Sequence, residues 1–117
     1  MPGESRSPRP SEALVPRPAV TVEALRAAVD RLDPEQTTLF DREFSEVNST
    51  ASAAYPVRTF LFRWALWVER YRVPATAARI HELELAMGAA QTDEEARAVA
   101  SEMSDLLAKV SASLALP

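Results

Sequence analysis

Residues 56–72 read PVRTFLFRWALWVERYR, and this stretch decides the fold of the 117-residue chain. At about 100° per residue, a helix through it gathers most of its large apolar side chains on one broad face. That face consists of Val57, Phe60, Leu61, Trp64, Trp67, Val68 and Tyr71. It holds four of the eight aromatic residues of the chain. Because large aromatic side chains dominate the burial of apolar area, we expect this face to be the core.

Phe62 and Leu66 lie nearly opposite this face, four residues apart and within reach of each other. The charged residues around them are Arg58, Arg63, Glu69 and Arg70. Two interpretations stay open. A helix that is apolar most of the way round is usually packed on both sides, which would make this the central helix of a bundle. Alternatively, Phe62 and Leu66 form an exposed anchor pair with an arginine rim, of the kind that binds a partner protein.

Prolines and polar caps divide the rest of the chain into helices. Asp33-Pro34 is typical of an N-cap followed by proline at the first helical position, and Gln36 closes a capping box. Pro56 and Pro74 stand where further helices can begin. The pattern predicts five helices, at residues 22–32, from 34 onward, at 56–72, at 74–87 and at 93–114.

Two further signals bound the last helices. Gly88 follows Met87, the last residue of an apolar stripe, at a place where a left-handed glycine would end the fourth helix. Thr92 and Glu95 form a second capping box, and the acidic residues in this first turn match the helix dipole.

The absence of strand signals decides the fold class. No run alternates with a period of two, and the chain has no Asn-Gly or Asp-Gly hairpin turn. We predict an all-α fold, a small antiparallel bundle of about five helices over residues 21–117. Residues 1–20 contain five of the nine prolines, so we expect them to form a flexible, disordered tail that buries little.

The composition excludes several kinds of site. The chain has no cysteine and a single histidine, His81, which argues against thiolate chemistry, multi-histidine metal sites and Ser–His triads. Its two glycines cannot build a phosphate-binding loop. The carboxylates lie on polar helix faces where solvated acids are expected, although Glu43 borders an apolar stripe. We therefore expect no cofactor, no metal and no enzymatic activity.

Charge and hydropathy suggest where the chain acts. The formal net charge of −4 disfavours general nucleic-acid binding. The most apolar run, residues 59–68, is interrupted by Arg63 and is too short to cross a membrane. We expect a cytoplasmic protein.

The charges are also segregated along the chain. Residues 56–79 carry five arginines against Glu69 alone, whereas residues 21–55 and 80–105 carry seven acids each. This arrangement predicts charge complementarity between neighbouring helices.

The arginine-bearing segment 56–87 allows an alternative function, that of a DNA-binding transcriptional regulator. A helix-turn-helix would then turn near residues 72–74 and place the fourth helix in the major groove. The face of that helix would present Arg79 beside Glu82 and Glu84, and acids repel phosphates. DNA binding is therefore the second hypothesis.

Three segments, LDPEQ at 32–36, FDREF at 40–44 and FRWALW at 62–67, combine a Pro-acidic helix start, a charged stripe between aromatic residues and a Trp-containing helix. In these features the chain resembles a family of small actinobacterial helical proteins of uncharacterised function, over roughly residues 22–90. The resemblance implies an accessory protein of the kind that in some cases accompanies toxins of the RelE/ParE type. It carries over no catalytic residue.

The sequence thus predicts a non-enzymatic helical protein–protein interaction module, antitoxin-like or regulatory in role. Its partner would be another protein, such as a small toxin, or a second copy of the chain in a homodimer. The candidate partner-binding residues are Phe62, Leu66, Arg58, Arg63 and Arg70.

Overall fold

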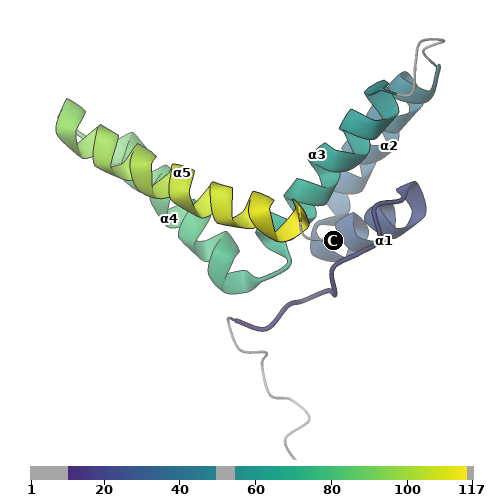
Figure 1. The fold of residues 1–117 in the computed structure, drawn as a ribbon, viewed down its shortest axis with the longest axis horizontal. Helices are drawn as coiled ribbons and strands as arrows, with labels where there is room; N and C mark the ends of the chain where they lie inside the picture. Colours follow the sequence, from purple (N-terminus) through teal and green to yellow (C-terminus); the bar gives the residue numbers. More distant parts are fainter. Residues whose placement is uncertain (1–10, 50–54, 116–117) are drawn as a thin grey trace, which may run out of the picture.

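The computed structural model describes residues 11–49 and 55–115, and every regular element in them is a helix (Figure 1). The helices are α1 (Val22–Leu32), α2 (Pro34–Ser49), α3 (Tyr55–Tyr71), α4 (Pro74–Ala89) and α5 (Asp93–Ala115). The predicted all-α class and the predicted helix positions are confirmed. Among the described helices, none has both the length and the apolarity that a membrane span needs.

Asp33 joins α1 to α2 and caps the start of α2 as predicted, but the backbone N–H that Gln36 was expected to bind donates to α1 instead. Its backbone N–H donates to the carbonyl of Val29 and closes α1, with an N···O distance of 2.8 Å. Its side-chain Oδ1 accepts from the backbone N–H of Glu35 at 3.1 Å and satisfies a free donor at the start of α2. One residue therefore serves both helix ends, and the chain turns sharply between them.

Near residue 90, the predicted N-terminal cap of α5 is confirmed and the predicted C-terminal cap of α4 is wrong. Thr92 Oγ1 accepts from the backbone N–H of Glu95 at 3.0 Å, as predicted. The Glu95 carboxylate reaches back to the backbone N–H of Gln91 at 2.8 Å. Gly88, however, lies inside α4 rather than at its cap. The helix runs on to Ala89 and ends at Ala90 in an extended conformation (φ −63°, ψ 132°), so no left-handed residue is needed there.

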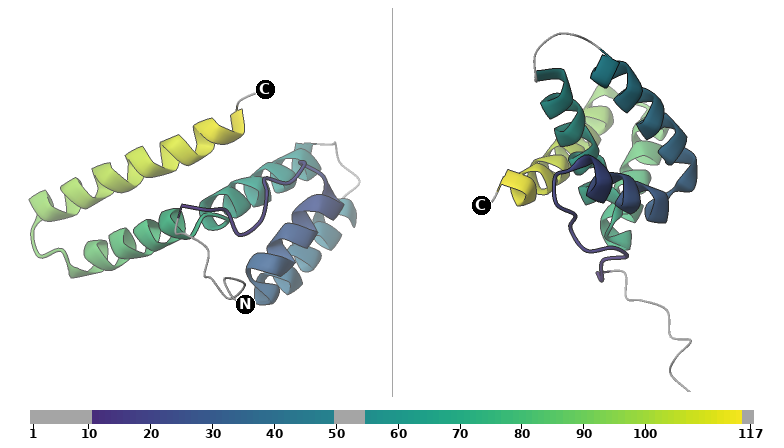
Figure 2. Two further views of the ribbon diagram at one scale, coloured as in Figure 1. Left: turned by 90° about the horizontal axis from the view of Figure 1, so that it is seen from below. Right: turned by 90° about the vertical axis from the view of Figure 1, so that its right-hand side faces the viewer.

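The helices form two arms of a V (Figures 1 and 2). In one arm, α1 and α2 pack against α3. The other arm is the antiparallel hairpin of α4 and α5, and the C-terminal part of α5 returns to contact α3. The radius of gyration is 16.9 Å, compared with about 13 Å for a compact domain of this length. The predicted bundle is thus an open one, in which the far half of the hairpin projects from the body.

The core lies in the first arm, where the broad apolar face of α3 meets α1 and α2. Phe60 and Val68 of α3, and Phe40 of α2, are fully buried. The Phe40 ring lies 5.0 Å from the Phe60 ring and 5.2 Å from Trp64, which it meets edge to face. Such tilted aromatic pairs are the arrangement that ring quadrupoles favour. The predicted core face is confirmed at these positions.

Ion pairs between helices confirm in part the predicted charge complementarity. Arg63 of α3 pairs with Glu43 of α2 at 3.5 Å. Arg79 of α4 pairs with Glu102 of α5, across the hairpin. The basic middle of the chain is therefore in contact with the acidic segments on either side of it. Because these side chains are mostly exposed, each pair adds little stability by itself.

Residues 11–20 differ from the predicted tail. They form a strap that lies against the helices: Val15 is buried, and the backbone N–H of Leu14 donates to the carbonyl of Arg72 at 2.6 Å. Arg17 makes a bidentate contact with Glu69 of α3, at 2.9 and 2.7 Å. Pro16 and Pro18 disfavour a helix in this segment but allow an extended segment held by side chains, and for this reason residues 11–20 differ from the expected tail. Residues 1–10 of the predicted tail lie outside the described residues.

Glu69 is the anchor of the strap. Its side chain is only 8% exposed, and Arg72 donates to it at 3.0 Å in addition to Arg17. The hydrogen bonds from Arg17, and then those from Arg72, lower the pKa of the Glu69 carboxyl against the opposing effect of burial. Arg72 also donates to the carbonyl of Val15, so the two arginines hold the strap to α3 from both sides.

We predict that Glu69→Gln lowers the free energy of unfolding at neutral pH by about 1–3 kcal/mol, because two arginines lose their charged acceptor. A carboxyl with a lowered folded pKa stabilises the fold above its unfolded pKa of about 4.3, and this contribution is lost as the pH falls through the folded value. Urea unfolding below pH 5 should therefore depend less steeply on pH in Glu69→Gln. The exposed Glu84→Gln is the control, and equal acid slopes in native protein and Glu69→Gln would contradict the anchor.

A second prediction separates the two faces of α3. Phe60→Ala, which empties a fully buried site, should lower the free energy of unfolding by about 3–5 kcal/mol. Phe62→Ala, two residues away and 49% exposed, should lower it by less than about 1 kcal/mol. Chemical unfolding of both variants measures the difference, and similar losses would mean that both faces of the helix are core.

Candidate functional site

Phe62 lies on the solvent side of α3. It is 49% exposed, one of the most exposed large apolar side chains among the described residues. Leu66, one turn further on, is half-buried. The helix is therefore not packed on both sides at this position. The anchor pair differs from the expectation only in that Leu66 is partly covered.

Leu66 lines a groove of about 230 Å³ between α2 and α3. The groove is lined by Gln36, Leu39 and Glu43 of α2 and by Arg63, Trp64, Leu66, Trp67 and Arg70 of α3. The structure thus brings three of the five predicted site residues together in one groove. Phe62 and Arg58 lie outside its lining, on the neighbouring surface of the same helix.

Glu43 organises the side of the groove that belongs to α2. Its Oε1 accepts a hydrogen bond from the indole Nε1 of Trp64 at 3.0 Å and pairs with Arg63 at 3.5 Å. The expectation of a solvated surface acid is wrong for Glu43, whose side chain is 22% exposed. Its place at the border of the apolar stripe was the sequence signal for this role. Glu43 thus holds Trp64 and Arg63, two of the α3 residues that line the groove, against α2.

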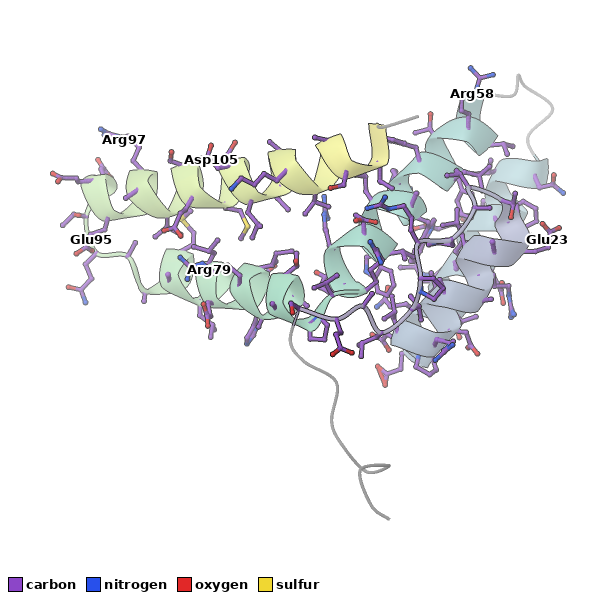
Figure 3. The ribbon with its side chains drawn as sticks, turned by 60° about the horizontal axis from the view of Figure 1, so that its bottom comes forward. Glu23, Arg58, Arg79, Glu95, Arg97 and Asp105 are labelled. Carbon is purple, nitrogen blue, oxygen red and sulfur yellow. The ribbon has the colours of Figure 1, made fainter. Side chains whose placement is uncertain are left out.

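The remaining arginines of the site leave positive charge available. Arg70 is half-buried at the groove, and its Nε is buried without a hydrogen-bond partner among the described residues. Arg58 extends outward from the first turns of α3 (Figure 3). Arg63 keeps 60% of its side chain exposed despite its pairing with Glu43. The surface therefore combines apolar contact area with an incompletely neutralised basic rim.

The residues considered for other chemistry lie elsewhere. His81 is exposed on α4, with its Nδ1 4.0 Å from Glu84. Within the described part of the chain, no three histidine or acidic side chains are placed to hold a metal ion. Arg79, the arginine on which DNA reading would depend, donates to Glu82 at 2.9 Å and also contacts Glu102. Two carboxylates thus already pair with its positive charge.

Comparison of the chain with protein-family models, with curated proteins and with solved structures finds no match.

The geometry of the groove predicts a difference between the two tryptophans of the chain. Trp64 is 4% exposed and hydrogen-bonded, whereas Trp67 is half-buried in the groove lining. Acrylamide should therefore quench the fluorescence of Trp64→Phe, which retains Trp67, more strongly than that of Trp67→Phe. Equal quenching of the two variants, with circular dichroism unchanged, would show that the groove is not formed as described.

Proposed function

We propose that this chain is a non-enzymatic protein–protein interaction module. Its binding site is the α3 docking surface, defined as Phe62 and Leu66 with Arg58, Arg63 and Arg70. The observation that carries the proposal is the exposed Phe62 beside a groove that already has an apolar floor and an arginine rim. Exposed aromatic and arginine side chains around an apolar centre are the composition that protein interfaces favour at their hot spots.

The size of the groove favours a protein side chain over a small molecule. Pockets that enclose drug-sized ligands measure about 300–1,000 Å³, and this groove holds about 230 Å³. A shallow groove next to a protruding aromatic ring suits a helix that inserts one or two side chains and covers Phe62 with its flank. Such a partner buries both parts of the surface at once.

The charge of the surface indicates the chemistry of the partner. Arg58, Arg63 and Arg70 favour a contact face with carboxylates around an apolar centre. No acid–base reaction is assigned to the groove, because arginine stays protonated in proteins and Glu43 is engaged with Trp64 and Arg63. The proposed role of the groove is therefore to bind a partner protein.

The resemblance of the sequence to actinobacterial accessory proteins supplies one partner for this proposal, a small toxin that the chain would bind in the cytoplasm in an antitoxin-like or regulatory role. DNA binding through residues 56–87 remains the alternative hypothesis from the sequence. The pairing of Arg79 with Glu82 and Glu102 favours protein recognition over it.

The test is co-purification from the native host with tagged protein. Phe62→Ala should weaken the capture of a specific partner by at least about 1–2 kcal/mol, roughly a five- to thirtyfold loss, and leave thermal unfolding nearly unchanged. Val20→Ala is the matched control, because Val20 is 53% exposed and belongs to another part of the molecule. If both variants retain every protein that the native chain retains, the docking function fails.

A further inference from the structure

A cavity of about 430 Å³ lies where the two arms of the V meet, lined by residues of the strap and of α1 to α4. This volume falls within the range of about 300–1,000 Å³ that pockets for small organic molecules measure. Leu32 and Tyr71, the last residues of α1 and α3, line the cavity together with Ala77 in the first turn of α4. We call this space the junction cavity.

The strap supplies one wall of the junction cavity. Leu14 lines it, and the backbone N–H of Leu14 donates to the carbonyl of Arg72 at 2.6 Å. Arg72 in turn donates from its side chain to the carbonyl of Val15 at 3.4 Å. These contacts hold the wall against the end of α3 in the free protein, so the cavity is already formed before a ligand binds. A preformed site loses less free energy to ordering when a ligand binds.

Aromatic and polar side chains complete the lining. Trp67 and Tyr71 lie one turn apart on α3, with their ring centroids 5.1 Å apart. Asp33 and Gln36 line the cavity from the turn before α2 and from its first turn. All four side chains are half-buried. The junction cavity therefore combines two aromatic rings, one carboxylate and one amide with apolar neighbours.

Asp33 is the one charged side chain in this lining. Its Oδ1 accepts from the backbone N–H of Glu35 at 3.1 Å, and within the described part of the chain no cationic side chain pairs with it. Arg72, which directly follows the end of α3, is bound to Glu69 instead. Two carboxylate oxygens offer about four acceptor positions, so Asp33 keeps most of its acceptor capacity and its full charge for a ligand.

Three further polar groups of the lining are free to bind a ligand. The amide of Gln36, the hydroxyl of Tyr71 and the indole N–H of Trp67 make no hydrogen bond to another described residue. A few polar groups that converge on a mostly apolar space are typical of small-molecule sites, where they fix the orientation of the ligand.

We propose that the junction cavity binds a small organic cation, an amine with an aromatic or other apolar body. The ammonium group pairs with the Asp33 carboxylate, and the body of the ligand lies against Trp67 and Tyr71. Aromatic rings attract cations through the negative charge of their faces, and tryptophan does so most strongly. The amide oxygen of Gln36 accepts a remaining ammonium hydrogen.

The charge of the lining selects a cation over other ligands. No arginine, lysine or histidine lines the junction cavity, so no side chain there would neutralise an anion. A neutral ligand would cover the Asp33 carboxylate without offering it a counter-charge, which costs free energy.

The junction cavity is separate from the α3 docking surface, because none of the five residues that define that surface lines it. Trp67 and Gln36 line both the cavity and the groove beside Leu66, so the two sites adjoin. Because the groove carries Arg63 and Arg70, it disfavours the cation that the cavity takes. The inference therefore stands or falls independently of the proposed docking function.

Titration of the full-length chain with 2-phenylethylammonium, followed by the NMR signals of the two indole N–H groups, tests the proposal. Trp64→Phe and Trp67→Phe assign these signals. The Trp67 signal should shift with a dissociation constant of about 1 mM, as expected for a ligand this small. The Trp64 signal should move much less, since that indole is buried and bound to Glu43. The alcohol 2-phenylethanol, which has the same body without the charge, should bind at least about tenfold more weakly.

Asp33→Asn removes the charge and keeps a side chain that caps helices equally well. It should weaken the binding of the cation at least about tenfold and leave the binding of the alcohol unchanged. Glu35→Gln is the matched control, because it removes an exposed acid two residues away that does not line the cavity. Ala77→Leu fills the cavity from α4 without changing a charge, and it should weaken the binding of both probes.

Four results would overturn the inference. The first is a Trp67 signal that does not shift at about 10 mM cation, and the second is equal affinity for the cation and the alcohol. The third is unchanged binding of the cation by Asp33→Asn, with circular dichroism showing an intact fold. The fourth is an equal loss in Glu35→Gln, which would mean that the cation senses only the general negative charge of this region. If Asp33→Asn does not fold, Ala77→Leu decides, and unchanged binding of the cation by that variant would contradict the site.

Discussion

The burial of the aromatic face of α3 against α1 and α2 is the interaction on which the rest of the structure depends. Phe60 and Trp64 pack around Phe40, and Val68 continues the same buried stripe toward the end of the helix. Once this face is buried, the rotation of α3 about its axis is determined. The side chains on its opposite side, Phe62 above all, must then face solvent or a partner, because a helix cannot turn one face without turning the other.

Two polar contacts preserve this orientation at different points along the helix. Glu43 accepts from the Trp64 indole, so a polar atom of the largest core side chain is satisfied where it would otherwise be buried alone. Near the end of α3, the Glu69 carboxylate binds the strap through Arg17 and the turn toward α4 through Arg72. The strap thus covers the end of α3 where the two arms meet, while the groove beside Leu66 stays open.

The open V leaves the far half of the α4–α5 hairpin outside the core of the first arm. The α4–α5 hairpin is held at its base by α3 and along its length by its own pairing. Its outer face keeps Leu85 in solvent.

Much of the fold could be read from the sequence, because prolines, caps and helical periodicity act over a few residues. These local signals placed all five helices, assigned Phe60 and Trp64 to the core and put Phe62 on the opposite side. Contacts between residues far apart in the chain could not be read this way. The pairing of Arg17 with Glu69, the place of Glu43 under Trp64, the groove at Leu66 and the angle between the arms depend on which helix faces meet. Helical periodicity determines which residues share a face, but only the packing of the whole chain decides what that face touches.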